Sequence, residues 1–249
     1  MNLFMRRLQH DWASWLAVSF IALLPFGRLA EIPLSAFTIA LLVLARTAEN
    51  RTLIRSSARF VLPLFLCYWV PMFLSSFDSM DMQKSWVQTF AALRYLAAAL
   101  ALSLLLRAPS DRERVLRWTA WLLLFWAADG FIQLFFGRDL FGIAMHPDRL
   151  NALFVKKYQF FGPTLAMLSP LVLEHARRNW PSWAWAMAFT LILGAVMIAG
   201  MRAGWLTMAI VLGTYMVLML KRENRELRRT VLTIPVLVVI VIAGSYLAS

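Results

Sequence analysis

Long apolar runs separated by short polar gaps make up most of this chain. A helix needs about 20 predominantly apolar residues to cross a bilayer, with a range of roughly 17–25. The pattern predicts nine such spans, the second and sixth of them short. Their approximate bounds are residues 11–27, 32–45, 60–77, 86–106, 118–136, 159–173, 183–200, 204–220 and 231–247. The predicted fold is therefore an all-α, polytopic transmembrane helical bundle.

The composition indicates that the chain is surrounded by lipid rather than by water. Hydrophobic residues make up 61% of it, charged residues only 15%, and the mean hydropathy is +0.67. A soluble domain has about half of its residues apolar and about a quarter charged. The net charge of +12 does not indicate a nucleic-acid partner, because the cations are spread over short gaps rather than gathered on one face. Membrane lipids are the expected surroundings, and residues 1–249 are expected to form a single transmembrane domain.

Gaps rich and poor in Lys and Arg alternate along the chain, and of its 25 basic residues only Arg94 lies outside them. The rich gaps hold Arg6, Arg7, Arg46, Arg51, Arg55, Arg59, Arg107, Arg112, Arg114, Arg117, Arg177, Arg178, Lys221, Arg222, Arg225, Arg228 and Arg229. The poor gaps hold Arg28, Lys84, Arg138, Arg149, Lys156, Lys157 and Arg202. Polytopic membrane proteins retain Lys and Arg on the cytoplasmic side. The alternation thus predicts a cytoplasmic N-terminus and, after nine spans, an extracytoplasmic C-terminus.

The cations on the predicted outer side are the ones that orientation does not explain. Four of them lie, with His146, in the longest polar connection, residues 137–158. Two interpretations are open: the connection is a solvated loop, or it forms a positively charged rim above a cavity that receives an anionic lipid. The number of cations favours the second. Arg202 stands between two apolar runs with almost no loop, so it either snorkels to the interface or holds a lipid phosphate. A guanidinium suits phosphate because its planar fork donates two hydrogen bonds and stays charged. Arg28 and Lys84 are shallow cations on the same side.

Arg94 is a charge inside a predicted span, about eight residues from the outer end. At 1.5 Å per residue it lies roughly 12 Å deep. An unpaired cation at that depth is costly, so a partner inside the bundle is expected. Asp129, in the outer half of the fifth predicted span, is the predicted partner. A structural ion pair and a direct contact with substrate both stay open for Arg94.

The sequence contains no pattern for metal or cofactor chemistry. His10, His146 and His175 lie far apart, and HExxH, paired-cysteine and aspartate-rich motifs are absent. Cys67 is the only cysteine. We therefore expect no metal ion and no cofactor, and assign no catalytic residue.

Two segments in the later half of the chain carry a family resemblance. MRAGWLTMAIVLG (201–213) and DRLNALFVKKYQFFGPTLAMLSPLVLE (148–174), with the many spans and basic inner loops, resemble the O-antigen ligase/polymerase family of bacterial envelope glycosyltransferases. The first is similar to that family's Ser-Arg-Gly/Ala-x-hydrophobic stretch at the start of a helix. The second is similar to its extracytoplasmic Arg-Leu-x-Gly-x-Phe loop, which leads into an Asn-x-x-Gly and Leu-Ala helix. Arg202 and, less closely, Arg149 match the family's arginines there.

The resemblance implies transfer of a glycan from undecaprenyl diphosphate on the periplasmic face of a bacterial inner membrane. The acceptor is the lipid A–core sugar in the ligase and a second lipid-linked glycan in the polymerase. Arginines hold the diphosphate, and neither a nucleotide sugar nor a catalytic metal takes part. A diphosphate leaves more readily when its charge is neutralised. The expected substrate-binding residues are therefore the outer-side cations Arg28, Lys84, Arg94, Arg149 and Arg202.

The chain also departs from the family pattern. Met201 stands where the family has serine, and the Asn-x-x-Gly pattern is reduced to Tyr158-Gln159-Phe160-Phe161-Gly162. The family's large periplasmic loop, with the histidine thought to act as the base, would begin after about residue 247. We therefore expect a truncated or split member that lacks this loop and is inactive alone. An O-antigen ligase-like glycosyltransferase is the function expected first. A polymerase, a transporter or flippase-like protein for anionic lipid-linked glycans, and a non-catalytic assembly partner are the alternatives.

Overall fold

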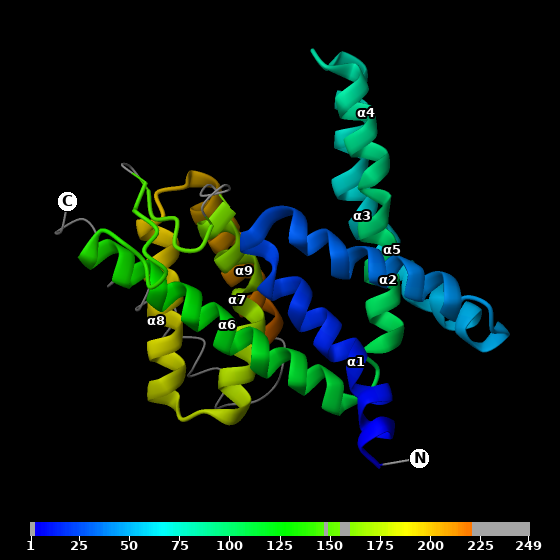
Figure 1. Cartoon of the computed structure of the whole chain (residues 1–249), viewed down its shortest axis with the longest axis horizontal. Helices are drawn as coiled ribbons and strands as arrows, with labels where there is room; N and C mark the ends of the chain where they lie inside the picture. The colour runs from blue at the N-terminus through cyan, green and yellow to red at the C-terminus, as the bar shows by residue number, and fades with distance from the viewer. Residues whose placement is uncertain (1–2, 147–148, 155–159, 221–249) are drawn as a thin grey trace. The chain divides into compact units, whose positions relative to one another are not determined.

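The computed structural model describes residues 3–146, 149–154 and 160–220, and every regular element within these ranges is helical (Figure 1). The all-α prediction is confirmed for this part of the chain. The α-helices are α1 (Leu3–Ala22), α2 (Glu31–Leu44), α3 (Ala48–Ser75), α4 (Met82–Ala91), α5 (Leu93–Leu105), α6 (Pro109–Phe136), α7 (Phe161–Asn179), α8 (Ser182–Ile198) and α9 (Arg202–Leu220). Two short 3-10 segments, η1 (Leu24–Ala30) and η2 (Ser76–Asp78), connect some of them.

Four helical stretches are long and apolar enough to cross a membrane. They are Leu24–Leu44, Ala48–Asp78, Met82–Leu105 and Pro109–Phe136, and they correspond to the second to fifth predicted spans. The helices α8 and α9 are apolar but shorter. By the length and composition of these helices, the chain is a membrane protein. Nine spans and the sidedness of the termini stay predictions, and the ninth span, 231–247, lies outside the described residues.

The first predicted span, 11–27, is not a single helix. The helix α1 ends at Ala22, and η1 follows it. Pro25 has no backbone N–H to donate. Gly27 has a φ of 66°, in the left-handed region that favours glycine. The chain therefore bends between α1 and α2 instead of continuing one span to residue 27.

By its internal contacts the chain divides into two compact units, residues 1–23 with 28–115 and residues 24–27 with 116–249. In the first unit α2 packs along α5, and α1 contacts both. Ala98 and Ala101 of α5 meet Leu34 and Phe37 of α2 in a buried core. Small side chains at such a contact let helix backbones approach closely. A single transmembrane domain, as expected from the sequence, stays a prediction.

The helices α3 and α4 form a hairpin through η2 in the same unit (Figure 1). The Trp69 indole N–H donates to the Thr89 carbonyl oxygen at 2.9 Å, and the buried hydroxyls of Ser76 and Thr89 lie 2.8 Å apart. Aromatic rings pack along the hairpin, with Phe73 and Trp86 edge to face at 5.3 Å. Side-chain hydrogen bonds between helices thus supplement apolar packing here.

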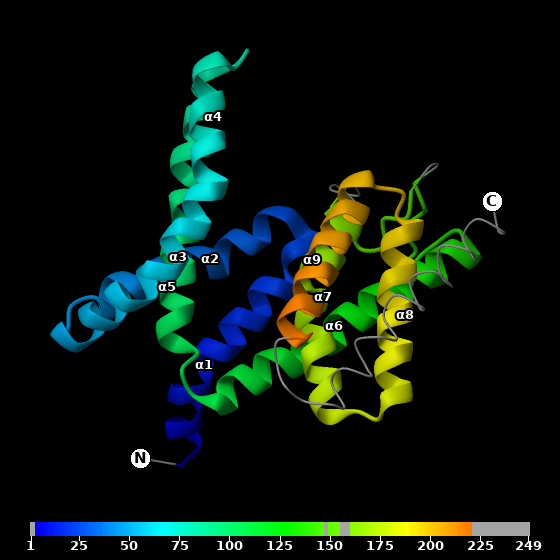
Figure 2. The ribbon, with the colours of Figure 1, turned by 180° about the vertical axis from the view of Figure 1, so that it is seen from behind.

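In the second unit α7 packs against both α8 and α9 (Figure 2). The first turns of α7 and α9 touch, because a Cβ on Gly204 would lie 3.3 Å from the Gly162 carbonyl carbon and from Pro163 N. The loop after α6 reaches the same place, since Leu150 and Phe161 both closely approach Gly130. We call this the loop end of the second unit: the end of α6, loop residues 137–146 and 149–154, the starts of α7 and α9, and the end of α8.

Candidate functional site

A buried glutamine on α6 holds the loop at the loop end. Gln133 is 0% exposed. Its side-chain oxygen accepts from the N–H groups of Asn151 at 3.1 Å and Ala152 at 2.8 Å. Its amide nitrogen donates to the Ile143 carbonyl oxygen at 3.2 Å. One side chain thus satisfies three backbone groups of the loop, which fixes two of its stretches over the end of α6.

Two buried carboxylates shape the first turn of the loop. Asp129 on α6 accepts from the Leu140 N–H at 2.9 Å. Asp139 accepts from the N–H groups of Phe141 at 3.0 Å and Ile143 at 2.7 Å. The second oxygen of each carboxylate is buried and has no hydrogen-bond partner among the described residues. Asp129 and Asp139 are therefore turned inwards and do not add negative charge to the surface of the loop.

Arg149 links the loop to the start of α9. Its Nη1 donates to the Met201 Sδ at 2.8 Å. Arg202 follows Met201 directly, begins α9 and is exposed. The structure thus brings two of the predicted substrate-binding residues, far apart in the sequence, to one end of the second unit.

The surface of the loop end carries positive charge. Arg138 and Arg202 are exposed and Arg149 is half-buried, whereas Asp129 and Asp139 are buried. The N-termini of α7 and α9 add partial positive charge, because their first N–H groups point out of the helices. This end of the described structure is therefore suited to an anion. The predicted loop charges Asp148, Lys156 and Lys157 lie outside the described residues.

His146 has a structural contact in the loop. Its backbone N–H donates to the Asn151 side-chain oxygen at 3.0 Å, and Asn151 is itself buried. Within the described ranges no three His, Cys, Asp or Glu side chains gather into a possible metal site.

The other three predicted site residues belong to the first unit, and Arg94 there has a different partner from the one predicted. Its Nη2 donates to the Glu31 Oε1 at 2.8 Å, and its Nη1 pairs with the Oε2. The prediction that Asp129 is the partner was wrong, because Glu31 occupies both Nη groups of Arg94, while Asp129 accepts from the Leu140 N–H. Arg94 thus forms a structural ion pair. The sequence feature that could have pointed to Glu31 is its position at the start of the second apolar run.

Arg28 and Lys84 are both exposed in the first unit. Arg28 lies in η1, three residues before Glu31. Lys84 lies in the first turn of α4, where its N–H donates to the Asp81 carboxylate at 3.1 Å. Nothing in the structure relates these two cations to Arg149 and Arg202, so a shared cradle of all five residues stays a prediction.

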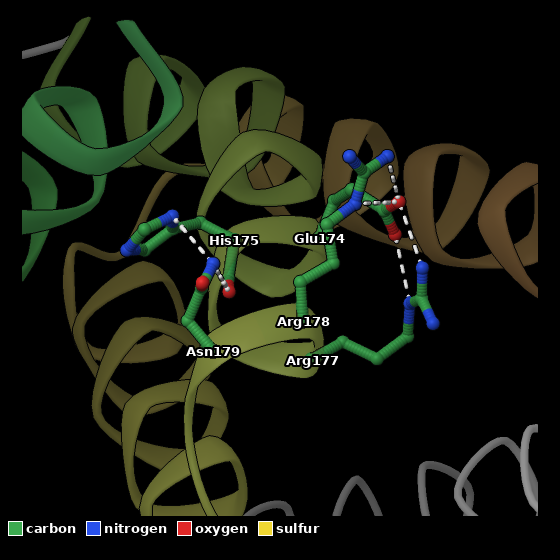
Figure 3. A network of polar contacts seen from close by, with 5 residues as sticks. All are labelled: Glu174, His175, Arg177, Arg178 and Asn179. Atoms are coloured by element: carbon green, nitrogen blue, oxygen red, sulfur yellow. Dashed lines mark hydrogen bonds and ion pairs between the residues drawn. The ribbon is translucent and has the colours of Figure 1, made fainter. Parts of the chain in front are cut away.

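At the opposite end of α7 a charged cluster stabilises the helix terminus (Figure 3). Glu174 accepts from Arg177 Nε at 2.9 Å and Nη2 at 2.8 Å, and from Arg178 Nε at 2.7 Å. Burial opposes ionisation of Glu174, but the hydrogen bonds and charges of the two arginines together hold the pKa of its carboxyl below the ordinary value. On the other side of the helix, Asn179 donates to the His175 carbonyl oxygen at 2.9 Å. Both sets of contacts tie α7 to itself.

Comparisons with known proteins give no relative for this chain: no family model, no curated protein and no solved structure matches it. Its class therefore rests on the helices and the site. It is a helical membrane protein whose second unit presents arginines and two helix N-termini at one end.

Proposed function

We propose that this chain is an O-antigen ligase-like protein that binds the diphosphate of an undecaprenyl-linked glycan at the loop end of its second unit. The glycan would pass to lipid A–core on the periplasmic face of a bacterial inner membrane. One observation carries the proposal: Arg149 contacts Met201, the residue before Arg202. Both of the arginines that the resemblance assigns to phosphate therefore lie at one end, beside two helix N-termini.

Transfer of a glycan from a diphosphate requires positive charge near the leaving group, here at the loop end. An acceptor hydroxyl attacks the anomeric carbon of the donor glycan, and the bond from that carbon to the diphosphate oxygen breaks. The diphosphate leaves with the electron pair, and the guanidinium groups stabilise its charge. The hydroxyl proton passes to a base, which the proposal does not assign to a described residue. Arg202 is exposed and so accessible to such a ligand.

Binding of undecaprenyl diphosphate to the full chain in nanodiscs tests the proposal. We expect Arg202→Ala to weaken binding about tenfold or more, since a charge-assisted hydrogen bond contributes about 1.5–3 kcal/mol. Arg202→Lys should bind several-fold more weakly than the native chain, because an ammonium cannot make a bidentate contact. Arg107→Ala, an exposed arginine outside the loop end, is the control. Equal affinities of the Arg202→Ala and native chains, or equal losses for Arg107→Ala and Arg202→Ala, would refute a specific site.

A cellular measurement separates the ligase from its alternatives. In cells that depend on this protein, Arg202→Ala should abolish O-antigen on lipopolysaccharide while membrane levels of the protein stay normal. A ligase defect leaves unattached polymer, whereas a polymerase defect leaves lipid A–core with single repeats. A normal lipopolysaccharide ladder on a gel would exclude both transferase functions.

A further inference from the structure

An open apolar groove of about 1020 Å³ lies between α6 and α8 in the second unit. The walls are hydrocarbon and aromatic side chains almost throughout. They include Trp121, Leu124 and Ala128 of α6 and Trp183, Met187 and Leu191 of α8. The two helices stand apart along this groove, and no other described part of the second unit fills it.

The groove is about as long, measured along α6, as one leaflet of a bilayer is thick. At one end the rings of Trp121 and Trp180 lie 5.5 Å apart. At the other end Phe131 reaches Gly194, where a Cβ would lie 3.0 Å from the phenyl ring. From Trp121 to Phe131, ten residues of helix rise about 15 Å. The hydrocarbon core is about 30 Å thick, so this length matches half of it.

An exposed arginine lies in line with the groove at its tryptophan end. At 100° per residue, Arg117 falls on the same stripe of α6 as the lining residues Trp121, Leu124 and Ala128, one turn before the first of them. Arg117 is exposed, and no described residue forms an ion pair with it. Trp180 and Trp183, in and just after the turn between α7 and α8, line this end of the groove together with Trp121, as in an interfacial belt.

The two arginines at the end of α7 have an acidic partner. Arg177 and Arg178 share Glu174, with N···O distances of 2.8 Å and 2.6 Å. The charge of Arg117 is left for a ligand. A positive charge one turn beyond a leaflet-deep apolar groove is complementary to a phospholipid, whose phosphate lies just outside its acyl chains.

We propose that this groove binds one anionic phospholipid, with an acyl chain between α6 and α8 and the phosphate on Arg117. This lipid site is at the opposite end of α6 from the loop end, and it does not depend on the proposed function. The headgroup belongs to the leaflet on the Arg117 side, which the alternation of charge predicts to be cytoplasmic. Its occupant is therefore a resident lipid and not the glycan donor.

Native mass spectrometry of the full chain with added phosphatidylglycerol or phosphatidylcholine tests this site. The native chain should retain phosphatidylglycerol in preference. Arg117→Gln should lower its apparent affinity for phosphatidylglycerol about fivefold, the effect of one basic residue at an anionic surface, and leave phosphatidylcholine unchanged. Arg117→Lys should keep the preference. Arg107→Gln, which removes an exposed charge from the first unit, is the control and should match the native chain.

Filling the groove gives a second, independent result. Ala184→Phe projects a ring into it from α8 and should reduce retention of both lipids. If circular dichroism and gel filtration show that Ala184→Phe does not fold, Thr190→Phe, which lies on the same wall of the groove, is used in its place. Equal retention of the two lipids by the native chain, equal effects of Arg117→Gln and Arg107→Gln, or unchanged retention in folded groove-filled variants would each overturn the proposal.

Discussion

Arg94 and Glu31 neutralise each other inside the first unit. The two hydrogen-bonding edges face one another, and the side chains are 35% and 40% exposed within the chain. Glu31 and Arg94 both lie in helical stretches that are long and apolar enough to cross a membrane. A charge in that setting is costly to leave alone. The pair thus makes it possible for α5 to carry an arginine within the bilayer.

We expect Glu31→Gln to lower the free energy of unfolding by about 2 kcal/mol, because it leaves the Arg94 guanidinium without a counterion. The double variant Glu31→Gln with Arg94→Gln should recover part of the loss. Unfolding in a detergent titration measures both. Glu49→Gln, at an exposed position of α3, should change stability by less than about 0.5 kcal/mol. If Glu31→Gln changes the free energy of unfolding no more than Glu49→Gln does, the ion pair does not stabilise the fold.

At the scale of elements, the end of α7 depends on the ionised form of Glu174. Arg177 and Arg178 both donate to its carboxylate, and its pKa lies below the ordinary value of 4.5. The unfolded chain therefore binds the proton more tightly than the folded chain does. The stability that this cluster contributes is complete above about pH 4.5 and is lost as the pH falls through the folded-state pKa.

Glu174→Gln should remove this contribution, about 1–2 kcal/mol at neutral pH. The difference in unfolding free energy between the native chain and the variant should be largest near pH 7 and shrink below about pH 4.5. Thermal unfolding followed by circular dichroism over that range measures it. A difference that stays constant or grows as the pH falls contradicts the assigned ionisation.

The helices could be predicted from hydrophobic pattern, because burial in lipid requires apolar residues in runs of fixed length. Their exact ends could not. The helix α7 continues past predicted residue 173 because Glu174 and its two arginines hold another turn and a half of helix. The bend at Pro25 and Gly27 depends on backbone conformation, which hydropathy does not report.

At the scale of the whole molecule, the alternation of charge has a counterpart in the second unit. Arg138, Arg149 and Arg202 lie at the loop end. Arg117, Arg177 and Arg178 lie at the ends of α6 and α7 away from it. In the described part of the second unit, the gaps rich in Lys and Arg thus lie at one end of the helices, and the gaps poor in them lie at the other.

We expect the loop end to face outwards and the turn between α7 and α8 to face the cytoplasm. In a Cys67→Ser background, an impermeant maleimide applied to intact spheroplasts should label Leu140→Cys and not Ser182→Cys, both of which are at exposed positions. Permeabilised cells should label both. Labelling of Ser182→Cys alone from outside would reverse the predicted orientation.

The candidate site was only partly predictable. Arg149 and Arg202 stood out because orientation did not explain their charge. Their connection through Met201 leaves no local signal, since it joins segments far apart in the chain. The role of Glu31 could not be predicted either, because its contact with Arg94 also joins segments far apart in the chain. A glutamate at the start of an apolar run looks like an ordinary helix-terminal charge until the packing of α2 on α5 brings it to Arg94.

The hydrogen bonds of Gln133 bear on which loop positions can vary. They are made to backbone N–H and carbonyl groups, which every residue type supplies except proline at the donor positions. The side chains of Leu140 and Phe141 are exposed. Substitutions at these two positions should therefore change the surface of the loop and leave its path unchanged, whereas substitution of Gln133 should change the path itself.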